Sequence, residues 1–214
     1  MKVLAFHTAG AACELAVIDG TDLLAENREA MMRGQDARLP GLTRGILVSA
    51  GLRLTQIDRF AVITGPGSFT GIRVGVAFGR GLALATGAPC IGVTSLEAAL
   101  PEGQQGSAIV ALPAQKRAPD VTFWTQTFRS GVATAPPTEM RAENLTALVQ
   151  ARPHMVYGDP DSLSDYLPVA TVRQAHPTAV RAAQTALTLD PHIRLARPTY
   201  ARAPDAVLPR TKDI

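Results

Sequence analysis

Short apolar runs separated by turn residues open the chain and predict a β-sheet that starts with hairpins. The first two runs are residues 3–6 and 14–18, and a third lies around residues 23–26. Asp19 and Gly20, between the second and third runs, form a dipeptide typical of β-hairpin turns. We therefore predict three antiparallel strands at the start of the sheet.

A helical pattern follows these strands. Apolar residues at spacings of three and four predict an amphipathic helix over residues 36–50. We expect Gly51 to end this helix, because glycine readily adopts the left-handed conformation found after helices. Pro40 is tolerated only near a helix start, so the first turn is expected close to Arg38 or Leu39.

The rest of the first half alternates strands with a second helix. Residues 60–63 are predicted as a buried strand parallel to the first, because a helix connects the two. A helix over residues 70–86 and a strand over residues 91–93 follow. The order β-β-β-α-β-α-β is the repeat of actin-like, sugar-kinase and Hsp70 ATPase proteins. We predict an α/β lobe of this type over residues 1–103.

Residues 104–214 carry a weaker copy of this pattern. Strands are predicted near residues 108–112, 122–128, 155–157 and 169–172, and helices near residues 139–150 and 178–187. The copy lacks the third strand, and its helices are short. The chain is therefore predicted to have a two-lobed actin-like ATPase (RNase H-like) fold with a degenerate second lobe and a C-terminal tail.

Composition narrows the classes of function. A net charge of +3 is mild for a nucleic-acid binder, and 5% aromatic residues are few for stacking on bases. Cys13 and Cys90 lie far apart in the sequence and form no Cys-x-x-Cys motif. Such cysteines indicate reduced thiols in a cytoplasmic protein. The N-terminal apolar run is too short for a signal peptide, and no apolar window is long enough for a membrane span. We expect a cytoplasmic protein with no membrane partner.

A glycine-rich turn precedes the second helix. Gly65 and Gly67 flank Pro66 and permit a sharp connection from strand to helix. Ser68 or Thr70 can cap the helix that follows. Backbone N–H groups and the helix dipole also make Gly65, Gly67, Ser68 and Thr70 a candidate anion loop, and capping without a ligand is an equal alternative. The Gly-Lys-Ser/Thr ending of a P-loop is absent.

Three glycines line one face of that helix. Gly71, Gly75 and Gly79 recur at every fourth position, and each is unfavourable by roughly 0.5 to 1 kcal/mol relative to alanine. Close approach of a helix from this chain or from a partner subunit would compensate. The larger apolar residues on the opposite side are predicted to face the sheet.

Several motifs together resemble the bacterial TsaB (YeaZ) family. They are residues 4–9, 65–75, 81–83, 92–96 and 198–204. The resemblance implies a non-catalytic cytoplasmic subunit of the machinery that forms N6-threonylcarbamoyladenosine at position 37 of tRNAs reading ANN codons. It also implies pairing with the catalytic TsaD subunit through the two predicted helices, with the TsaE ATPase joining and tRNA bound indirectly through the complex.

The resemblance places a partner interface on both helices. The predicted residues are Leu39, Leu42, Ile46, Gly71, Arg73, Gly75 and Gly79. Gly75→Leu is accordingly expected to abolish pairing with TsaD while the monomer stays folded. The same surface would form a homodimer when the chain is alone, and a self-associating scaffold without an enzyme partner is an alternative.

Polar residues of the family pattern are missing at three positions. His7 stands where the first strand usually ends in aspartate, and a neutral imidazole cannot replace a carboxylate at a magnesium site. Gln35 replaces a frequent histidine, and the segment 111–114 lacks the usual acid. We therefore expect no cofactor and no metal, with at most a vestigial nucleotide site.

The rival interpretation is an ATP-dependent kinase-like or peptidase-like enzyme of the same superfamily. The four histidines are dispersed rather than paired at metal-ligand spacing. A sugar kinase should also have a second phosphate loop with an acidic catalytic base. The only candidates for that base are Asp159 and Asp161, and aspartates next to proline are more often turn formers.

Overall fold

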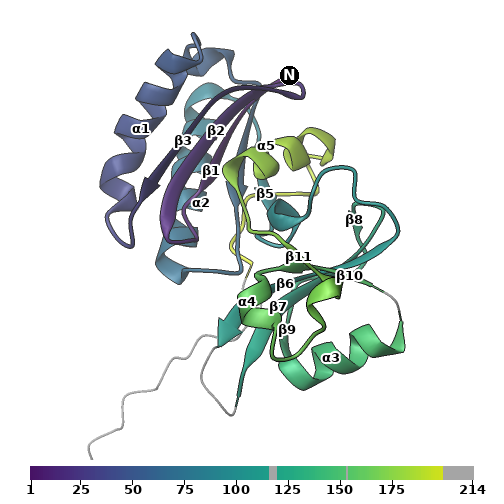
Figure 1. Ribbon diagram of the computed structural model, residues 1–214. Helices are drawn as coiled ribbons and strands as arrows, with labels where there is room; N and C mark the ends of the chain where they lie inside the picture. The colour runs from purple at the N-terminus through teal and green to yellow at the C-terminus, as the bar shows by residue number, and fades with distance from the viewer. Residues whose placement is uncertain (116–119, 153, 200–214) are drawn as a thin grey trace, which may run out of the picture.

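The computed structural model describes residues 1–115, 120–152 and 154–199, which form two lobes, each built on a mixed β-sheet (Figure 1). The strands of the first sheet are β1 (Lys2–His7), β2 (Ala12–Asp19), β3 (Asp22–Ala30), β4 (Arg59–Ile63) and β5 (Cys90–Val93). They lie in the order β3-β2-β1-β4-β5. The predicted β-β-β-α-β-α-β lobe is confirmed.

The pairing within the first sheet is as predicted. Strand β1 is antiparallel to β2 and parallel to β4, β2 is antiparallel to β3, and β5 is parallel to β4. Gly20 turns the β2–β3 hairpin with a positive φ of 58°. Residues Val3 to His7 are buried, because helices cover both faces of the sheet.

Two helices from the first half cover one face of this sheet, and a helix from the second half covers the other (Figure 1). Helix α1 (Gln35–Ser49) and helix α2 (Phe69–Thr86) follow the predicted order. Helix α5 (Ala179–Thr188) contacts β1, β2, β4 and β5. The prediction that the helix over residues 178–187 completes the second lobe is therefore wrong.

Small side chains explain where α5 packs. Its buried residues are Ala179, Ala182, Ala183 and Ala186, which belong to the core cluster of the first sheet. A flat alanine surface lets the helix lie close to the strands. Arg59 of β4 donates hydrogen bonds to the carbonyls of Ala186 and Leu189 at the C-terminal end of α5.

The start of α1 differs from the prediction. The helix begins at Gln35, after Gly34 with φ 84°, so Pro40 lies inside it rather than in its first turn. Proline has no N–H to donate to the carbonyl of Asp36. Both Asp36 and Pro40 are exposed, and water can satisfy that carbonyl. Gly51, with φ 66°, follows the helix end as predicted.

The second sheet repeats the strand order of the first. It runs β11-β10-β6-β7-β8, with β9 also paired to β7. The elements of this lobe are β6 (Ser107–Gln115), β7 (Thr122–Arg129), β8 (Val132–Ala133), β9 (Thr138–Arg141), α3 (Ala142–Ala151), β10 (Met155–Gly158), α4 (Pro160–Leu163) and β11 (Val172–Gln174). The short strands β8 and β9 together occupy the position of the third strand, which we had expected to be missing.

Two element boundaries in this lobe also differ. The helix predicted from residue 139 begins at Ala142, because Thr138 to Arg141 pair with β7. A 3-10 turn (Val169–Thr171) precedes β11, where a strand over residues 169–172 was predicted. A boundary between residues 103 and 104 remains a prediction.

After α5 the chain returns along the edge of β5. Gly92 N–H donates to the carbonyl of Arg194, and Ile91 forms an antiparallel bridge with Leu195. Thr199 N–H donates to the carbonyl of Thr64, beside the glycine-rich turn. Residues 200–204 of the C-terminal motif, and the predicted tail, lie outside the described residues.

None of the helices in the described part of the chain is both long enough and apolar enough to span a membrane.

Candidate partner interface

The glycine-rich turn is held by the loops around it. Ser68 N–H donates to the carbonyl of Ala9 at 2.9 Å, and Ser95 Oγ donates to the carbonyl of Pro66 at 2.6 Å. Ser68 Oγ accepts from Gly71 N–H at 3.2 Å, so Ser68 is the helix cap. A Cβ at Gly67 would lie 2.7 Å from the carbonyl oxygen of Ala9.

These contacts use N–H groups that the predicted anion loop would need for a ligand. The N–H of Ser68 in the loop and that of Gly71, just after it, already have partners within the chain. Ser68 and Thr70 are exposed, as is Gly67, while Gly65 is buried. Anion binding by Gly65, Gly67, Ser68 and Thr70 remains a prediction.

The three glycines of α2 face the sheet of their own chain. A Cβ at Gly71 would lie 2.0 Å from the carbonyl oxygen of Thr8, and one at Gly75 would lie 2.4 Å from Thr8 Oγ1. A Cβ at Gly79 would lie 2.4 Å from Val62 Cγ1. The prediction that these glycines dock a second helix or a partner is therefore wrong. Gly75→Leu would disrupt the monomer itself rather than only its pairing.

Most other residues predicted for the interface are also buried. Leu39 and Ile46 of α1 belong to the core of the first lobe, and Leu42 is half-buried against it. Arg73 is the exposed member of the predicted set, all of which the structure describes. Its guanidinium lies 5.1 Å from the ring centroid of Phe69.

A different stripe of the two helices is open to solvent. We call it the outer helical face. It consists of Gly41, Gly45 and Val48 of α1 and Phe69, Arg73, Ala77, Gly81 and Leu84 of α2, all exposed. These positions recur at three and four residues, so each set lies on one side of its helix.

The outer helical face combines large apolar side chains with glycines. Leu84 is 89% exposed, Val48 75% and Phe69 49%. Added Cβ atoms at Gly41, Gly45 and Gly81 would meet no atom within 4 Å. Helices α1 and α2 contact each other, so the two stripes lie on neighbouring helices (Figure 1). Exposed apolar side chains beside glycines, where no side chain covers the backbone, favour close packing of another helix.

Comparison with known proteins places this fold in a family. A family model described as "TsaD: tRNA N6-adenosine threonylcarbamoyltransferase" matches residues 29–117. The tRNA threonylcarbamoyladenosine biosynthesis protein TsaB of Escherichia coli is 40% identical over 97 residues, which cover 45% of this chain and 41% of that protein. An uncharacterised protein of Mycobacterium tuberculosis H37Rv is 32% identical over 209 residues, covering 95% of this chain and 93% of that protein.

Solved structures share the fold of this chain. A Pseudomonas aeruginosa protein described as similar to peptidase YEAZ has a TM-score of 0.72 at 22% identity, over 94% of this chain and 99% of that one. The chain therefore belongs to the same family as this mycobacterial protein, and its first half is similar to TsaB (YeaZ). It spans about two fifths of the length of the curated TsaB relatives that it matches.

The TsaB fold is shared with a wider group. A ROK hexokinase from Thermus thermophilus has a TM-score of 0.53 at 16% identity, over 87% of this chain and 97% of that one. This likeness confirms the predicted actin-like fold class. The outer helical face lies within the segment that matches the TsaD family model.

The residue that replaces the aspartate of the TsaB pattern is buried. His7 is 4% exposed, and its Nδ1 has no hydrogen-bond partner among the described residues. Burial, followed by the charges of His176 and Arg28, lowers the pKa of His7 to about 4. The imidazole is therefore neutral at physiological pH.

This buried histidine makes stability depend on pH. The pKa of His7 is about 4 in the folded protein and about 6.5 when unfolded, so the unfolded state binds more protons between these values. Stability should fall by about 3 kcal/mol as the pH drops through this range. His7→Asn should lose this part of the pH dependence, measured by urea denaturation from pH 4 to 7. Parallel curves for both proteins would contradict the assignment.

Asp159, one of the two acidic residues considered for an enzyme, has a structural role. Asp159 caps α4: its carboxylate accepts hydrogen bonds from Asp161 N–H and from Ser162 Oγ. Among the residues that the structure describes, no three His, Cys, Asp or Glu side chains are grouped as a metal site.

Proposed function

We propose that this chain is the non-catalytic partner of TsaD in the formation of N6-threonylcarbamoyladenosine on tRNAs reading ANN codons. It binds TsaD through the outer helical face and supports its catalysis. The observation that carries this proposal is an exposed apolar stripe on the two helices that lie within the TsaD-like segment.

The likeness to TsaD suggests how the two proteins pair. Residues 29–117 match the TsaD family model, and TsaD of Granulibacter bethesdensis is 40% identical over 70 residues. Both proteins thus carry related segments. Two related surfaces can pack around a pseudo-twofold axis, as identical ones do in a symmetric dimer. The chain alone forms a homodimer through the same face, which TsaD displaces.

Burial of the exposed side chains supplies the binding energy. Removing Leu84, Val48 or Phe69 from water contributes roughly 1.5 to 3 kcal/mol for each side chain that becomes fully buried. The open positions at Gly41, Gly45 and Gly81 let a partner helix approach the backbone. Bulky apolar residues beside glycines are thus suited to a tightly packed helical interface.

The chain contributes binding rather than chemistry. The position of the superfamily's metal-binding aspartate holds His7, which is buried and neutral. Pro113 and Ala114 stand where the family's second acid would lie. The proposed protein uses no cofactor of its own, works in the cytoplasm, and assembles with the TsaE ATPase and with tRNA through TsaD.

Reconstitution tests the proposed function. TsaD, TsaE and a source of activated threonylcarbamoyl groups are incubated with unmodified tRNA, with and without this chain. Modified nucleoside is measured by mass spectrometry, and TsaD binding by co-purification. We expect modification only when the chain is present and TsaD co-purifies with it. Full modification without the chain, or no TsaD in the purified complex, would contradict the proposal.

A further inference from the structure

A second surface, in the other lobe, has the chemistry of an anion site. It is a cavity of about 650 Å³ at one end of the second sheet. The lining residues are Ser107, Thr127, Phe128, Arg129, Thr134, Leu148, Arg152 and His154. They come from β6, β7, the β8–β9 connection, α3 and the segment before β10, so the cavity is assembled only by folding.

The charged residues of this lining are all basic. Arg129 and Arg152 are exposed and form no ion pair with another described residue. His154 Nδ1 donates to the carbonyl of Arg152 at 2.8 Å, because a carbonyl oxygen can only accept. In the neutral ring Nε2 then accepts, so the charged donors for an anion are the two guanidinium groups. The hydroxyl of Ser107 adds a neutral donor, whereas that of Thr134 already donates to the carbonyl of Thr127 at 3.1 Å.

Five of the acidic residues in the described part of this lobe lie at its opposite end. They follow β6 or β10, precede β7, or lie where β9 joins α3: Asp120, Glu139, Glu143, Asp159 and Asp161. The cavity lies instead where β6 begins and β7 and α3 end. The cavity lining thus carries basic charge alone, whereas at the opposite end Arg141 pairs with Asp120, so anions are favoured at the cavity.

The rim of the cavity is held in place by backbone contacts. Ser130, next to Arg129, has a left-handed φ of 47°. Its N–H donates to the carbonyl of Gly106 at 2.8 Å, and its Oγ accepts from Gly106 N–H at 3.3 Å. Gly131 N–H donates to Gln104 Oε1 at 3.1 Å. Arg129 thus projects from a fixed turn, which reduces the entropy lost on binding.

We propose that this cavity binds phosphate groups of the tRNA backbone. The inference deepens the proposed function and rests on it. Arginine forks match phosphate oxygens, and exposed arginines bind one free anion weakly but a polyanion through several phosphates at once. Phe128 is buried, so the site offers no ring for base stacking. The contacts therefore position tRNA without reading its sequence.

The cavity and the outer helical face can be occupied together. Helix α1 lies at the outer side of the first lobe, and the C-terminal end of α3 lies at the far side of the second lobe (Figure 1). A TsaD subunit on the outer helical face therefore leaves the basic end of the second lobe open to the tRNA that TsaD modifies.

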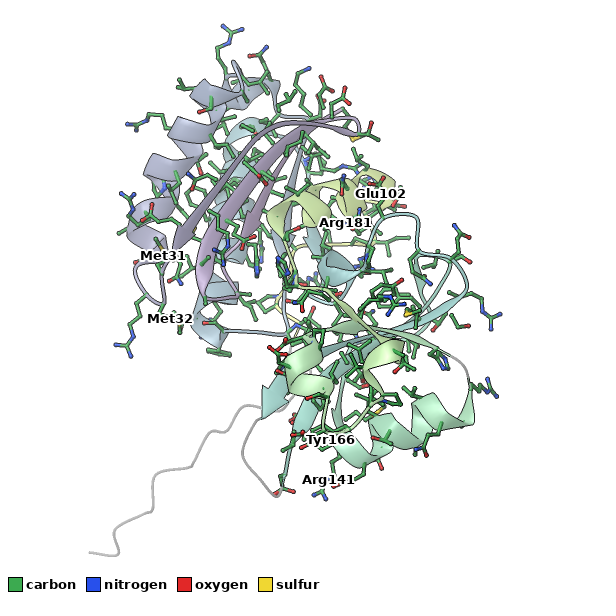
Figure 2. All side chains as sticks on the ribbon, in the orientation of Figure 1. Met31, Met32, Glu102, Arg141, Tyr166 and Arg181 are labelled. Atoms are coloured by element: carbon green, nitrogen blue, oxygen red, sulfur yellow. The ribbon has the colours of Figure 1, made fainter. Side chains whose placement is uncertain are left out.

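Removal of the two arginines tests this site. Binding of labelled tRNA is measured at increasing KCl, for the full chain and for its complex with TsaD. Arg129→Gln with Arg152→Gln should weaken binding about tenfold at low salt and lower the slope of log K against log[KCl] by about 1.5. The matched control is Arg141→Gln with Arg173→Gln, which removes the same charge from other parts of this lobe; Figure 2 shows Arg141, the last residue of β9, at the bottom of the view.

Each outcome separates this inference from the proposed function. A complex that forms normally but binds tRNA equally well with either pair of substitutions overturns the cavity site and leaves the TsaD partnership intact. Dependence on Arg129 and Arg152 in a chain that does not bind TsaD supports the cavity and contradicts the partnership. Inorganic phosphate that binds the chain alone as tightly as tRNA does would overturn the inference, because the site would then serve a small anion.

Discussion

Gly71→Ala is expected to destabilise the protein by about 3 kcal/mol or more, as measured by urea denaturation. The new Cβ would lie 2.0 Å from the carbonyl oxygen of Thr8, which is backbone and cannot rotate away. Helix α2 would have to move from β1. That movement would also break the buried hydrogen bond from Thr8 Oγ1 to the carbonyl of Gly71, now 2.7 Å.

Gly81→Ala is the matched control within the same helix. Gly81 is exposed, and an added Cβ meets no atom within 4 Å. Alanine favours the helix over glycine, so this substitution should stabilise the protein by about 0.5 to 1 kcal/mol. The two substitutions differ only in what the new methyl group meets. Equal effects at Gly71 and Gly81 would show that propensity, not contact with Thr8, determines the result.

This contrast shows what glycine spacing can predict. The repeat of Gly71, Gly75 and Gly79 correctly indicated a close approach to one face of the helix. The approaching atoms belong to Thr8 and Val62, which are distant in the sequence. Spacing within one helix carries no information about which of several surfaces will come near it. The docking partner assigned from spacing was therefore wrong, although the contact itself is real.

Local patterns were sufficient for most of the first lobe. Strands β1, β2 and β4 have long buried runs, and Gly51 and Gly87 end α1 and α2 with positive φ. In the second lobe the signals are weaker. Strand β8 has two residues, and α5 buries alanines that fit either lobe. Its position against the first sheet follows from packing over a long sequence separation, which periodicity does not report.

The candidate interface was harder to predict than the fold. Leu39 and Ile46 are core residues, although they were predicted at an interface. Apolar residues fill both cores and interfaces, so residue type alone does not separate the two. Leu84 and Ala77 lie on a helix whose only charged residues are Arg73 and Arg80, so the solvent side is weakly marked in the sequence. Arg129, Arg152 and His154 of the cavity come from separate elements and meet only in the folded lobe.

The other large effect is expected on the outer helical face. Leu84→Glu should weaken TsaD binding about 100-fold, or about 3 kcal/mol, measured by titration calorimetry and by co-purification. Leu84 is 89% exposed in the chain alone, so the free protein loses almost no packing when it is replaced. In the complex, glutamate would place an unpaired charge where a leucine side chain is buried.

Val169→Glu separates this local effect from the added charge. Val169 is 65% exposed and lies in the second lobe, away from α1 and α2, so the variant should bind TsaD as the unaltered chain does. Both variants should unfold within about 0.5 kcal/mol of the original protein, as surface substitutions usually do. Retained TsaD binding by Leu84→Glu would exclude the outer helical face as the interface. Loss of binding at unchanged stability would assign recognition to the exposed side of α2, opposite the glycines that fix this helix to the sheet.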